Sequence, residues 1–452
     1  MIKLTIPNNN IHEREYIIDI IFREFLNIEY KIVISSNPSC CNWEIELDNG
    51  NKIFCEDHFF NKYKTELEYL KLENLPSEVK FTKNKFISKN DVAVIYGSSN
   101  FDIKINDREK VVICGIDIFA SIFFMLTRWE EYVNKKRDQH NRFSAFESIA
   151  FKNGFLERAV VDEYIAMLKN ILIELEYDSN RFKVKDYELY ISHDVDVIYR
   201  WKSLKQVLKI AISDIIKRRS FSLALERILE YSAICRNKIN DPYDTFDFLM
   251  EKSEFLGTKS RFYFMSGGNT KYDKQYNIFD LEAVDLIEKI KKRKHIIGIH
   301  PSYDAYNDFQ QLKLEKESLE KISNQKILEG REHYLRFEVP TTWQIWEDVG
   351  LEVDSTCGYA DYIGFRCGTG KEYSVFNILN RKKLKLKERP LVVMDASLFN
   401  YNEFTYESAY NKVLNLMYST DEFTMLWHNS SVNNIKFYKN LIDMVRQRLI
   451  SK

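Results

Sequence analysis

Aspartate and histidine side chains gather at the end of one short apolar run, in residues 188–200, which read ELYISHDVDVIYR. Residues 188–191 predict a strand entering a core, and His193, Asp194 and Asp196 follow it directly. Asp194 and Asp196 alternate, so both side chains leave an extended chain on the same side. Two such carboxylates repel each other unless a cation or a proton lies between them. This stretch therefore predicts a metal site in which one aspartate binds the ion and the other is a general base.

Further polar residues stand near the ends of later predicted strands. From residue 187 onward, short apolar runs alternate with helical stretches, a pattern typical of βα units. The predicted strands are 187–191, 261–265, 295–299, 334–339, 351–353, 391–394 and 423–427. The residues near their ends include His300, His333, Asp354, Asp395 and His428. Since the active site of a βα barrel lies where its strands end, we expect one mixed Asp/His site, as in divalent-metal hydrolases.

Each of these residues also has an ordinary structural interpretation. An Asp-x-Asp after a strand often caps the next helix. A lone histidine such as His300 is more often structural than a ligand, and His428 could simply begin a turn. The joint placement favours a functional site, because the structural explanation has to be repeated separately at each strand end.

The surrounding sequence predicts two domains, the usual expectation for 452 residues. A polar, turn-rich stretch near residue 180 divides a smaller α+β domain, 1–180, from an α/β domain, 181–452. The first domain has predicted strands at 31–35, 43–47 and 92–96 and predicted helices at 117–133 and 155–176. The second has a helical insertion at about 201–240, with helices at 202–218 and 221–235, and later helices from Asp241, at 280–292 and at 341–349.

Composition limits the binding partners and the cellular location that the sequence predicts. The net charge of −1, from 66 basic and 67 acidic residues, gives no global electrostatic case for nucleic acid or an anionic membrane. The apolar run 112–126 contains Asp117 and is too short to span a bilayer, so we expect no stable membrane insertion. The chain begins without a signal-peptide layout, and seven cysteines without paired metal spacing, Cys40 and Cys41 included, indicate reduced thiols and a cytoplasmic location. The oligomeric state stays open.

Several ordered segments resemble polysaccharide deacetylases of the NodB-homology type, carbohydrate esterase family four. They are ISHDVD, IGIHPSY, the YLRFEVP region, LEVDST and MLWHNSS, and they extend over roughly residues 185–450. RWEEY at 128–132, the RD-x-H-x-RF pattern at 137–143 and GFRCGT at 364–369 resemble a subgroup with an extra N-terminal domain. The resemblance implies a distorted (β/α)7 barrel and metal-dependent removal of N-acetyl groups from sugars.

The same resemblance implies a role for each matching residue. It makes Asp194 the base that activates water, and Asp196 and His300 ligands of a divalent ion, with zinc as the first choice. It makes His428 the general acid that protonates the leaving amine. The implied supporting residues are Asp354, which orients catalytic groups, and either Arg336 or Arg331, which holds the base.

One motif departs from the family pattern. The family has His-x-x-x-His in its second motif, whereas Asp304 stands four residues after His300 here. His333 is the favoured replacement, because Asp304 lies in a polar, turn-like stretch and because Arg331 and His333, two apart, would share a strand face. Coordination by Asp304 is the alternative. Loss of the metal site is a third, against which the retained Asp and His residues argue.

The expected activity is that of a metal-dependent carbohydrate N-deacetylase acting on a sugar or a surface-polysaccharide precursor. Candidate substrate-binding residues are Tyr303, Trp427, Asp395 and Arg366, although core packing is the safer default for most aromatic side chains near strand ends. Three alternatives remain: an amidohydrolase for a non-sugar substrate, a catalytically degenerate glycan-binding protein, and a structural partner protein with chance motifs.

Overall fold

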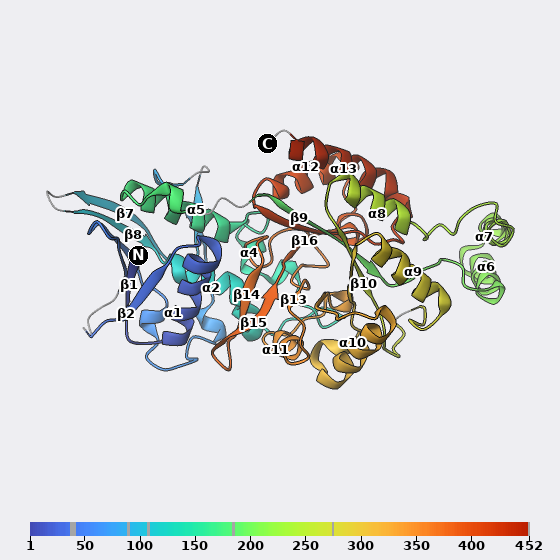
Figure 1. The fold of residues 1–452 in the computed structure, drawn as a ribbon, viewed down its shortest axis with the longest axis horizontal. Coiled ribbons are helices and arrows are strands. Elements are labelled where there is room, and N and C mark those ends of the chain that lie inside the picture. Colours follow the sequence, from blue (N-terminus) through green and yellow to red (C-terminus); the bar gives the residue numbers. More distant parts are fainter. Residues whose placement is uncertain (37–41, 88–90, 106–108, 183–185, 274, 451–452) are drawn as a thin grey trace. The chain divides into compact units, whose positions relative to one another are not determined.

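The chain is a mixed α/β protein (Figure 1). A computed structural model describes residues 1–36, 42–87, 91–105, 109–182, 186–273 and 275–450; Cys40 and Cys41 lie outside them. The described chain divides into two compact units. Unit 1 comprises Met1–Leu189, Tyr303–Lys313 and Leu328–Met425, and unit 2 comprises Tyr190–Ser302, Leu314–Ile327 and Leu426–Lys452. The predicted division at residue 180 stays a prediction about domains.

A six-stranded sheet with the order β2-β1-β3-β4-β8-β7 lies in the first part of unit 1. Its strands are β1 (Ile2–Ile6), β2 (Tyr30–Ile34), β3 (Asn42–Glu46), β4 (Lys52–Glu56), β7 (Gly97–Ile105) and β8 (Lys110–Ile116). The pairs β1–β2 and β4–β8 are parallel, and the other pairs are antiparallel. Strands β5 (Lys80–Thr82) and β6 (Val92–Val94) pair separately. The strands predicted at 31–35, 43–47 and 92–96 are confirmed.

Apolar side chains of this sheet are buried, and several helices accompany its strands in unit 1 (Figure 1). These helices are α1 (Ile11–Ile18), α2 (Ile118–Thr127), α3 (Trp129–Val133), α4 (Ile149–Lys152) and α5 (Val160–Glu174). The indole of Trp43 on β3 stacks on the ring of Phe119 on α2, with ring centres 4.3 Å apart. The single helix predicted over 117–133 is wrong in detail, because Arg128 takes a left-handed conformation, φ 53°, between α2 and α3.

The later part of unit 1 holds most of the strands that follow the IGIHPSY segment around His300. They are β12 (Glu329–Gly330), β13 (Val353–Asp354), β14 (Tyr373–Asn377), β15 (Lys382–Glu388), β16 (Leu391–Met394) and most of β17 (Glu422–Leu426), with helices α11 (Thr341–Asp348) and α12 (Tyr406–Met417). The strand predicted at 334–339 is wrong. The strand there ends at Gly330, and residues His333–Leu335 form a 3-10 turn in which Tyr334 has φ 60°. Arg331 and His333 therefore do not share a strand face.

Unit 2 contains three parallel strands, β9 (Glu188–Val195), β10 (Ser260–Phe264) and β11 (Ile296–Ile299). Its helices include α8 (Phe246–Phe255), α9 (Leu281–Lys292) and α13 (Ile435–Ile450), and α10 (Phe309–Ser323) is divided between the two unit ranges. In strand order, β14-β15-β13-β12 and β17-β16 belong mainly to unit 1, and β11-β10-β9 belong mainly to unit 2. Closure as a (β/α)7 barrel stays a prediction.

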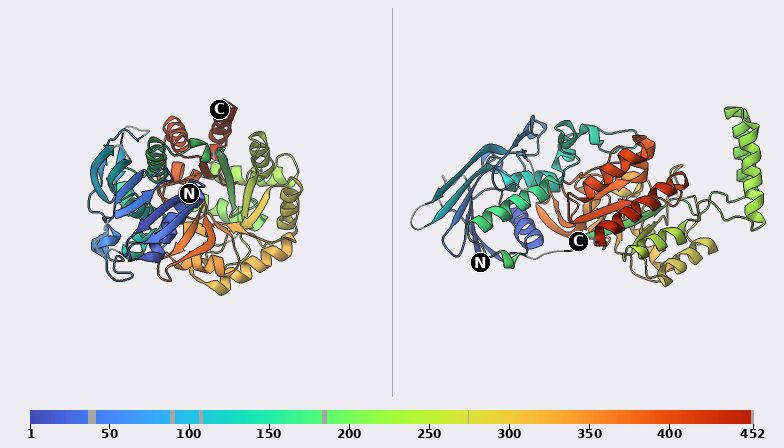
Figure 2. Two further views of the ribbon diagram at one scale, coloured as in Figure 1. Left: turned by 60° about the vertical axis from the view of Figure 1, so that its left-hand side comes forward. Right: turned by 90° about the horizontal axis from the view of Figure 1, so that it is seen from above.

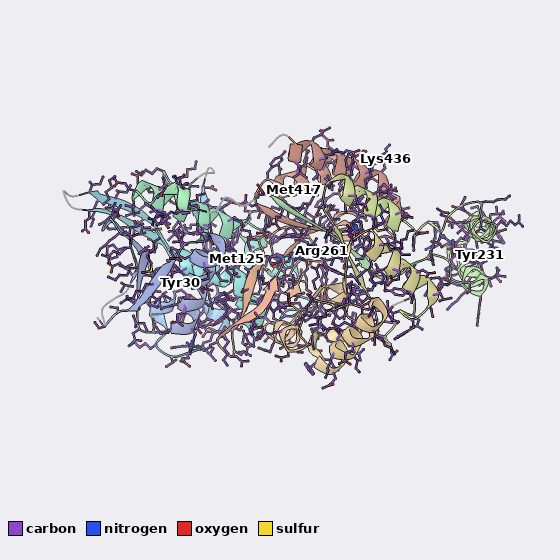
Figure 3. All side chains as sticks on the ribbon, in the orientation of Figure 1. Tyr30, Met125, Tyr231, Arg261, Met417 and Lys436 are labelled. Atoms are coloured by element: carbon purple, nitrogen blue, oxygen red, sulfur yellow. The ribbon has the colours of Figure 1, made fainter. Side chains whose placement is uncertain are left out.

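The two helices predicted at 202–218 and 221–235 are confirmed in unit 2, and their role as an insertion stays a prediction. Helix α6 (Leu204–Arg218) and helix α7 (Phe221–Cys235) lie side by side (Figures 1 and 2). Figure 3 labels Tyr231 on α7. Ser203 and Ser220 cap the two helices by accepting hydrogen bonds from the backbone N–H groups of Gln206 and Leu223.

Candidate metal and catalytic site

Strand β9 is longer than predicted and carries the opening motif almost to its end. It is buried from Ile191 to Val195, so Asp194 lies within a hydrogen-bonded strand rather than in a loop. Asp194 stands beside Tyr263 of β10 in the parallel register. Asp196 follows the last strand residue, and its side chain is 36% exposed, against 3% for Asp194. The fold therefore gives the two carboxylates different solvent access.

Two histidines lie beside these carboxylates within unit 2. The Nε2 atom of His300 is 3.3 Å from Oδ1 of Asp196 and 3.9 Å from Oδ2 of Asp194. The Nε2 atom of His428 is 3.8 Å from Oδ2 of Asp196. The backbone N–H of His300 donates to the carbonyl of Phe264 on β10, 2.8 Å away, which fixes the chain at this position. The four residues are thus assembled from the ends of three separate segments.

His193, between them in sequence, has a structural role. Its ring is fully buried, and its two nitrogens lie 2.7 Å from the carbonyl of Trp427 and 3.1 Å from the hydroxyl of Ser260. Burial lowers the pKa of His193 to about 4, so the ring is neutral at physiological pH. A neutral ring held by two hydrogen bonds joins neighbouring strands and is not available as a ligand.

Of the three favoured ligands, Asp196 and His300 belong to unit 2 and His333 belongs to unit 1. His333 is buried, at 5% exposure. Asp304, the alternative ligand, has a side chain that is 67% exposed, and its Oδ1 accepts a hydrogen bond from Arg336 at 2.8 Å. A carboxylate and two imidazoles are donors that suit zinc and other first-row divalent ions.

The two arginine candidates have different surroundings. Arg336 donates to Asp304 and to the carbonyls of His140 and Tyr303, and its guanidinium lies 4.0 Å above the ring of Tyr303. Arg331 is fully buried and donates to the carbonyl and the hydroxyl of Ser355, at 2.8 and 3.0 Å. The hydrogen bonds of Arg336 therefore go mainly to the segment around Tyr303, whereas Arg331 is buried next to β13.

Asp354 is a fully buried carboxyl at the end of β13. Its Oδ1 accepts hydrogen bonds from the backbone N–H and the hydroxyl of Thr356, and its Oδ2 accepts none from the residues that the structure describes. Burial raises the pKa of Asp354 to about 7, because hydrogen bonds from Thr356 and the charges of Arg331 and Arg366 only partly offset desolvation. The protonation state of this carboxyl therefore changes near neutral pH.

The four substrate-binding candidates do not share one environment. Trp427 is 2% exposed and packs against Phe437 and Tyr438, which fits a core residue. Asp395 is also buried, at 2%. Tyr303 is partly exposed, and its hydroxyl lies 3.1 Å from Nδ1 of His140. Arg366 is buried and pairs with both carboxylate oxygens of Glu131, at 2.9 and 2.5 Å.

The pairing of Arg366 explains why two distant signatures occur together. RWEEY and GFRCGT meet in unit 1, where Glu131 also accepts a hydrogen bond from Arg128 at 2.9 Å. Burial alone would raise the pKa of Glu131, but Arg366 and Arg128 lower it to about 2. Fully desolvated charges of this kind are costly unless all are paired. The geometry is that of a structural ion-pair network.

Sequence reasoning missed residues that build the loop after β11. Glu315 of α10 is 2% exposed, and its Oε2 accepts a hydrogen bond from the backbone N–H of Ser302, 2.8 Å away. Its backbone carbonyl accepts one from the hydroxyl of Ser266. Glu315 thus holds the HPSY segment next to the end of β10. A buried glutamate within a polar helix pattern gives no distinct signal in sequence.

Sequence reasoning also gave no site role to the loop 137–143. Arg142 donates to the carbonyl of Tyr334 at 3.1 Å, and Asn141 donates to the hydroxyl of Tyr306 at 3.0 Å. The ring of His140 lies 4.6 Å from that of Tyr334. The RD-x-H-x-RF pattern was the available signal, and the loop supports the segment that carries His333 and Arg336.

Asp196 also opens onto a pocket of about 870 Å³ within unit 2. Helix α6 supplies much of its lining, which is rich in cationic side chains: Lys209, Lys217 and Arg218 of α6, Arg227 of α7, and Arg200 before α6. Asp214 accepts a hydrogen bond from Arg227 and ion-pairs with Arg218.

Among the described residues, no helix combines the length and the apolar character needed to cross a membrane.

One known family is similar to the first part of the chain. Residues 2–177 match the family described as DUF7033, a family of unknown function. The match covers less than half of the chain and ends close to the boundary predicted near residue 180. No curated protein matches the chain.

The similar solved structures are remote. A protein from Mycobacterium smegmatis, provisionally described as a polysaccharide deacetylase, is 13% identical, with a TM-score of 0.37 over 58% of this chain and 85% of its own. A CE4 family pseudoenzyme from Bacillus anthracis is 10% identical, with a TM-score of 0.31 over 58% and 62%. The catalytic domain of a peptidoglycan N-acetylglucosamine deacetylase from Eubacterium rectale is 12% identical, with a TM-score of 0.28 over 59% and 86%.

Proposed function

We propose that the chain is a metal-dependent hydrolase that removes an N-acetyl group from a sugar or surface-polysaccharide precursor in the cytoplasm. The observation that carries this proposal is the grouping of Asp194, Asp196, His300 and His428. The motif resemblance described from sequence names the same four residues. A carboxylate and imidazole set of this kind suits hydrolysis of an unactivated amide.

The proposed ligands are Asp196, His300 and His333, with zinc as the first choice. Nε2 of His300 lies 3.3 Å from Oδ1 of Asp196, and all three residues are of the types that zinc prefers. When bound, a divalent ion would polarise the acetyl carbonyl and lower the pKa of water. Asp304 is the weaker candidate, because its side chain is exposed and ion-paired with Arg336.

The proposed proton transfers belong to Asp194 and His428. Asp194 takes a proton from the attacking water, and its location within β9 keeps its carboxylate fixed and almost free of solvent. His428, 17% exposed and close to Asp196, donates a proton to the leaving nitrogen. The arginine that the resemblance assigns to orienting the base is either Arg331 or Arg336.

The decisive experiment compares Asp194→Asn with wild type for both metal content and acetate release from N-acetylhexosamine oligosaccharides. We expect Asp194→Asn to keep its metal and to lose about 10²- to 10⁴-fold in turnover, the usual contribution of a general base. Asp186→Asn is the matched control, since Asp186 is exposed eight residues upstream.

Three outcomes are informative. Full activity of Asp194→Asn would overturn the assignment of the base. Wild-type protein that takes up a divalent ion but releases no acetate would favour the alternatives of a non-sugar amide substrate or a glycan-binding protein. Wild-type protein that takes up no divalent ion would contradict the proposed function itself.

A further inference from the structure

The α6–α7 pair exposes an unusual amount of apolar surface. On α6, Leu204, Leu208, Ile212 and Ile216 recur every four residues and are 52%, 43%, 54% and 70% exposed. A four-residue spacing places these side chains along one face of the helix. The other face, with Val207 and Ala211, is buried.

Helix α7 repeats this arrangement. Its exposed apolar residues are Phe221, Leu225, Ile228 and Leu229, at 74%, 57%, 36% and 59%. Their spacing of four, seven and eight residues again defines one helical face. Ala224 is buried on the inner side of the pair, and Asp214 of α6 bonds Arg227 of α7 at 2.8 Å. Each helix therefore packs through its inner face and leaves an apolar stripe outside.

Positive charge surrounds the two stripes. Residues 202–238 contain nine Lys or Arg and three Asp or Glu, a net charge of +6 in a chain whose total is −1. The exposed cations of α6 and its flanks are Lys202, Lys205, Lys209, Lys217, Arg218 and Arg219. On a helical projection, Lys205 and Lys209 border the stripe of Leu204–Ile216.

We propose that the α6–α7 pair binds the surface of an anionic lipid bilayer. Amphipathic helices with apolar side chains on one face and Lys or Arg beside them lie in the membrane interface, held by apolar burial and by attraction to anionic headgroups. Each helix has 15 residues, about 22 Å at 1.5 Å per residue, too short for a hydrocarbon core of about 30 Å. The pair therefore lies on the membrane and does not cross it.

Charge distinguishes this partner from a second copy of the chain. Symmetric pairing of two copies through this surface would bring two segments of net charge +6 together, which opposes association. An anionic surface compensates that charge, and a nucleic acid would leave the leucine and isoleucine side chains in water.

The bilayer would also lie close to the proposed reaction centre. Helix α6 supplies Lys209 and Lys217 to the wall of the pocket onto which Asp196 opens. A membrane-bound α6 thus favours substrates carried at the bilayer over soluble ones. This last step rests on the proposed function, whereas membrane binding itself does not.

The test is flotation of the full chain with two kinds of vesicle, phosphatidylcholine alone and phosphatidylcholine with about 30% phosphatidylglycerol. We expect at least tenfold tighter binding to the anionic vesicles, weakened by salt. Leu208→Glu with Ile212→Glu should reduce it at least tenfold, and Lys205→Glu with Lys209→Glu should remove the preference for phosphatidylglycerol. Leu281→Glu, at a leucine 76% exposed on α9, is the matched control and should bind as wild type does.

Equal binding to both vesicles, or unchanged binding by the Leu208→Glu and Ile212→Glu variant, would overturn the proposal. A dimer in light scattering that this variant converts to a monomer, without vesicle binding by wild type, would assign the surface to a second copy instead. The circular dichroism melt of each variant confirms that it is folded. Because no readout depends on turnover, an inactive protein that binds anionic vesicles would reject the proposed function and keep this inference.

Discussion

Single residues in this protein owe their chemical state mainly to burial. Asp354 and His193 are both fully buried, and burial moves the pKa of each toward the neutral form, to about 7 and about 4. Asp194 and Asp196 differ in exposure although they are two positions apart. The strand β9 and its end thus assign different environments to neighbouring residues of the same type.

The raised pKa of Asp354 predicts a specific dependence of stability on pH. A carboxyl with a pKa of about 7 in the folded state and 3.8 when unfolded contributes stability that is complete below 3.8 and is lost as pH rises through 7. Asp354→Asn cannot ionise, so we expect the unfolding free energy of wild type to fall relative to the variant between pH 4 and 7. At about 1.4 kcal/mol per pKa unit, the upper limit of that fall is about 4 kcal/mol.

Chemical denaturation of both proteins at several pH values measures this difference. Glu130, with a pKa of about 7, titrates in both proteins and cancels, whereas buried Glu388, whose pKa Asp354 helps to raise, contributes to the difference. A difference that stays constant from pH 4 to 8 would show that the carboxyl of Asp354 has an ordinary pKa.

The third metal ligand is the second prediction at this scale. We expect His333→Ala to lower the affinity for zinc by an order of magnitude or more, since removing one of three protein ligands leaves an incomplete site. Asp304→Ala should leave zinc affinity within about twofold, because its exposed carboxylate serves Arg336. Competition with a chromophoric chelator gives both values, and the reverse order of effects would assign the ligand to Asp304.

At the scale of elements, close packing after β10 positions the second motif. Gly268 has φ +83°, and a Cβ there would lie 2.5 Å from Cβ of Ser302 and still closer to Asp273. We expect Gly268→Ala to lower the unfolding free energy by about 2–4 kcal/mol, the sum of a left-handed backbone and an overpacked contact.

A matched variant separates the two causes. Gly257 has φ +74° but open space around its Cβ position, so Gly257→Ala carries the backbone cost of about 1 kcal/mol alone. Urea denaturation measures both. Equal losses in the two variants would mean that the loop after β10 moves to accommodate the methyl group.

Elements with their own periodic pattern could be predicted, and elements defined by tertiary contacts could not. Helices α6, α7 and α9 match the predicted ranges closely, because their amphipathic spacing and caps are local. The segment 334–339 reads as an apolar strand, but the left-handed Tyr334 and Leu335 make a turn held by Arg142 from far away in sequence. The hairpin β14–β15 was missed, because Lys-rich β15 alternates buried and exposed residues without a strong apolar run.

The residues of the candidate site also fall into those that the sequence could predict and those that it could not. Asp194, Asp196, His300 and His428 could be named because they stand beside strand ends that sequence identifies. Glu315 and the 137–143 loop could not, since their contacts join segments that no local pattern relates.

At the scale of the whole molecule, unit 1 is built from segments that are far apart in the sequence. Unit 1 combines Met1–Leu189 with Leu328–Met425, and charged groups from both segments are buried together. Arg366 pairs with Glu131, and Arg381 pairs with Glu13 at 2.8 Å. The stability of unit 1 therefore depends on ion pairs between segments that are distant in sequence.

Removing one residue of such a buried ion pair should lower the unfolding free energy. Glu131→Gln leaves the buried Arg128 and Arg366 without their carboxylate, and we expect a loss of about 3–5 kcal/mol in unfolding free energy. Glu147→Gln, which removes exposed pairs with Lys136 and Lys152, should cost about 1 kcal/mol or less. Thermal and denaturant unfolding test both, and comparable small losses would mean that water reaches the buried pair.

The Glu131–Arg366 pair also has a consequence for how the chain is made. The two residues are 235 positions apart, so Glu131 leaves the ribosome long before its partner has been synthesised. At roughly 5–20 residues per second, the interval is roughly 10 to 50 seconds. During that time the nascent N-terminal segment lacks the later residues of unit 1, and Glu131 has no Arg366 with which to pair.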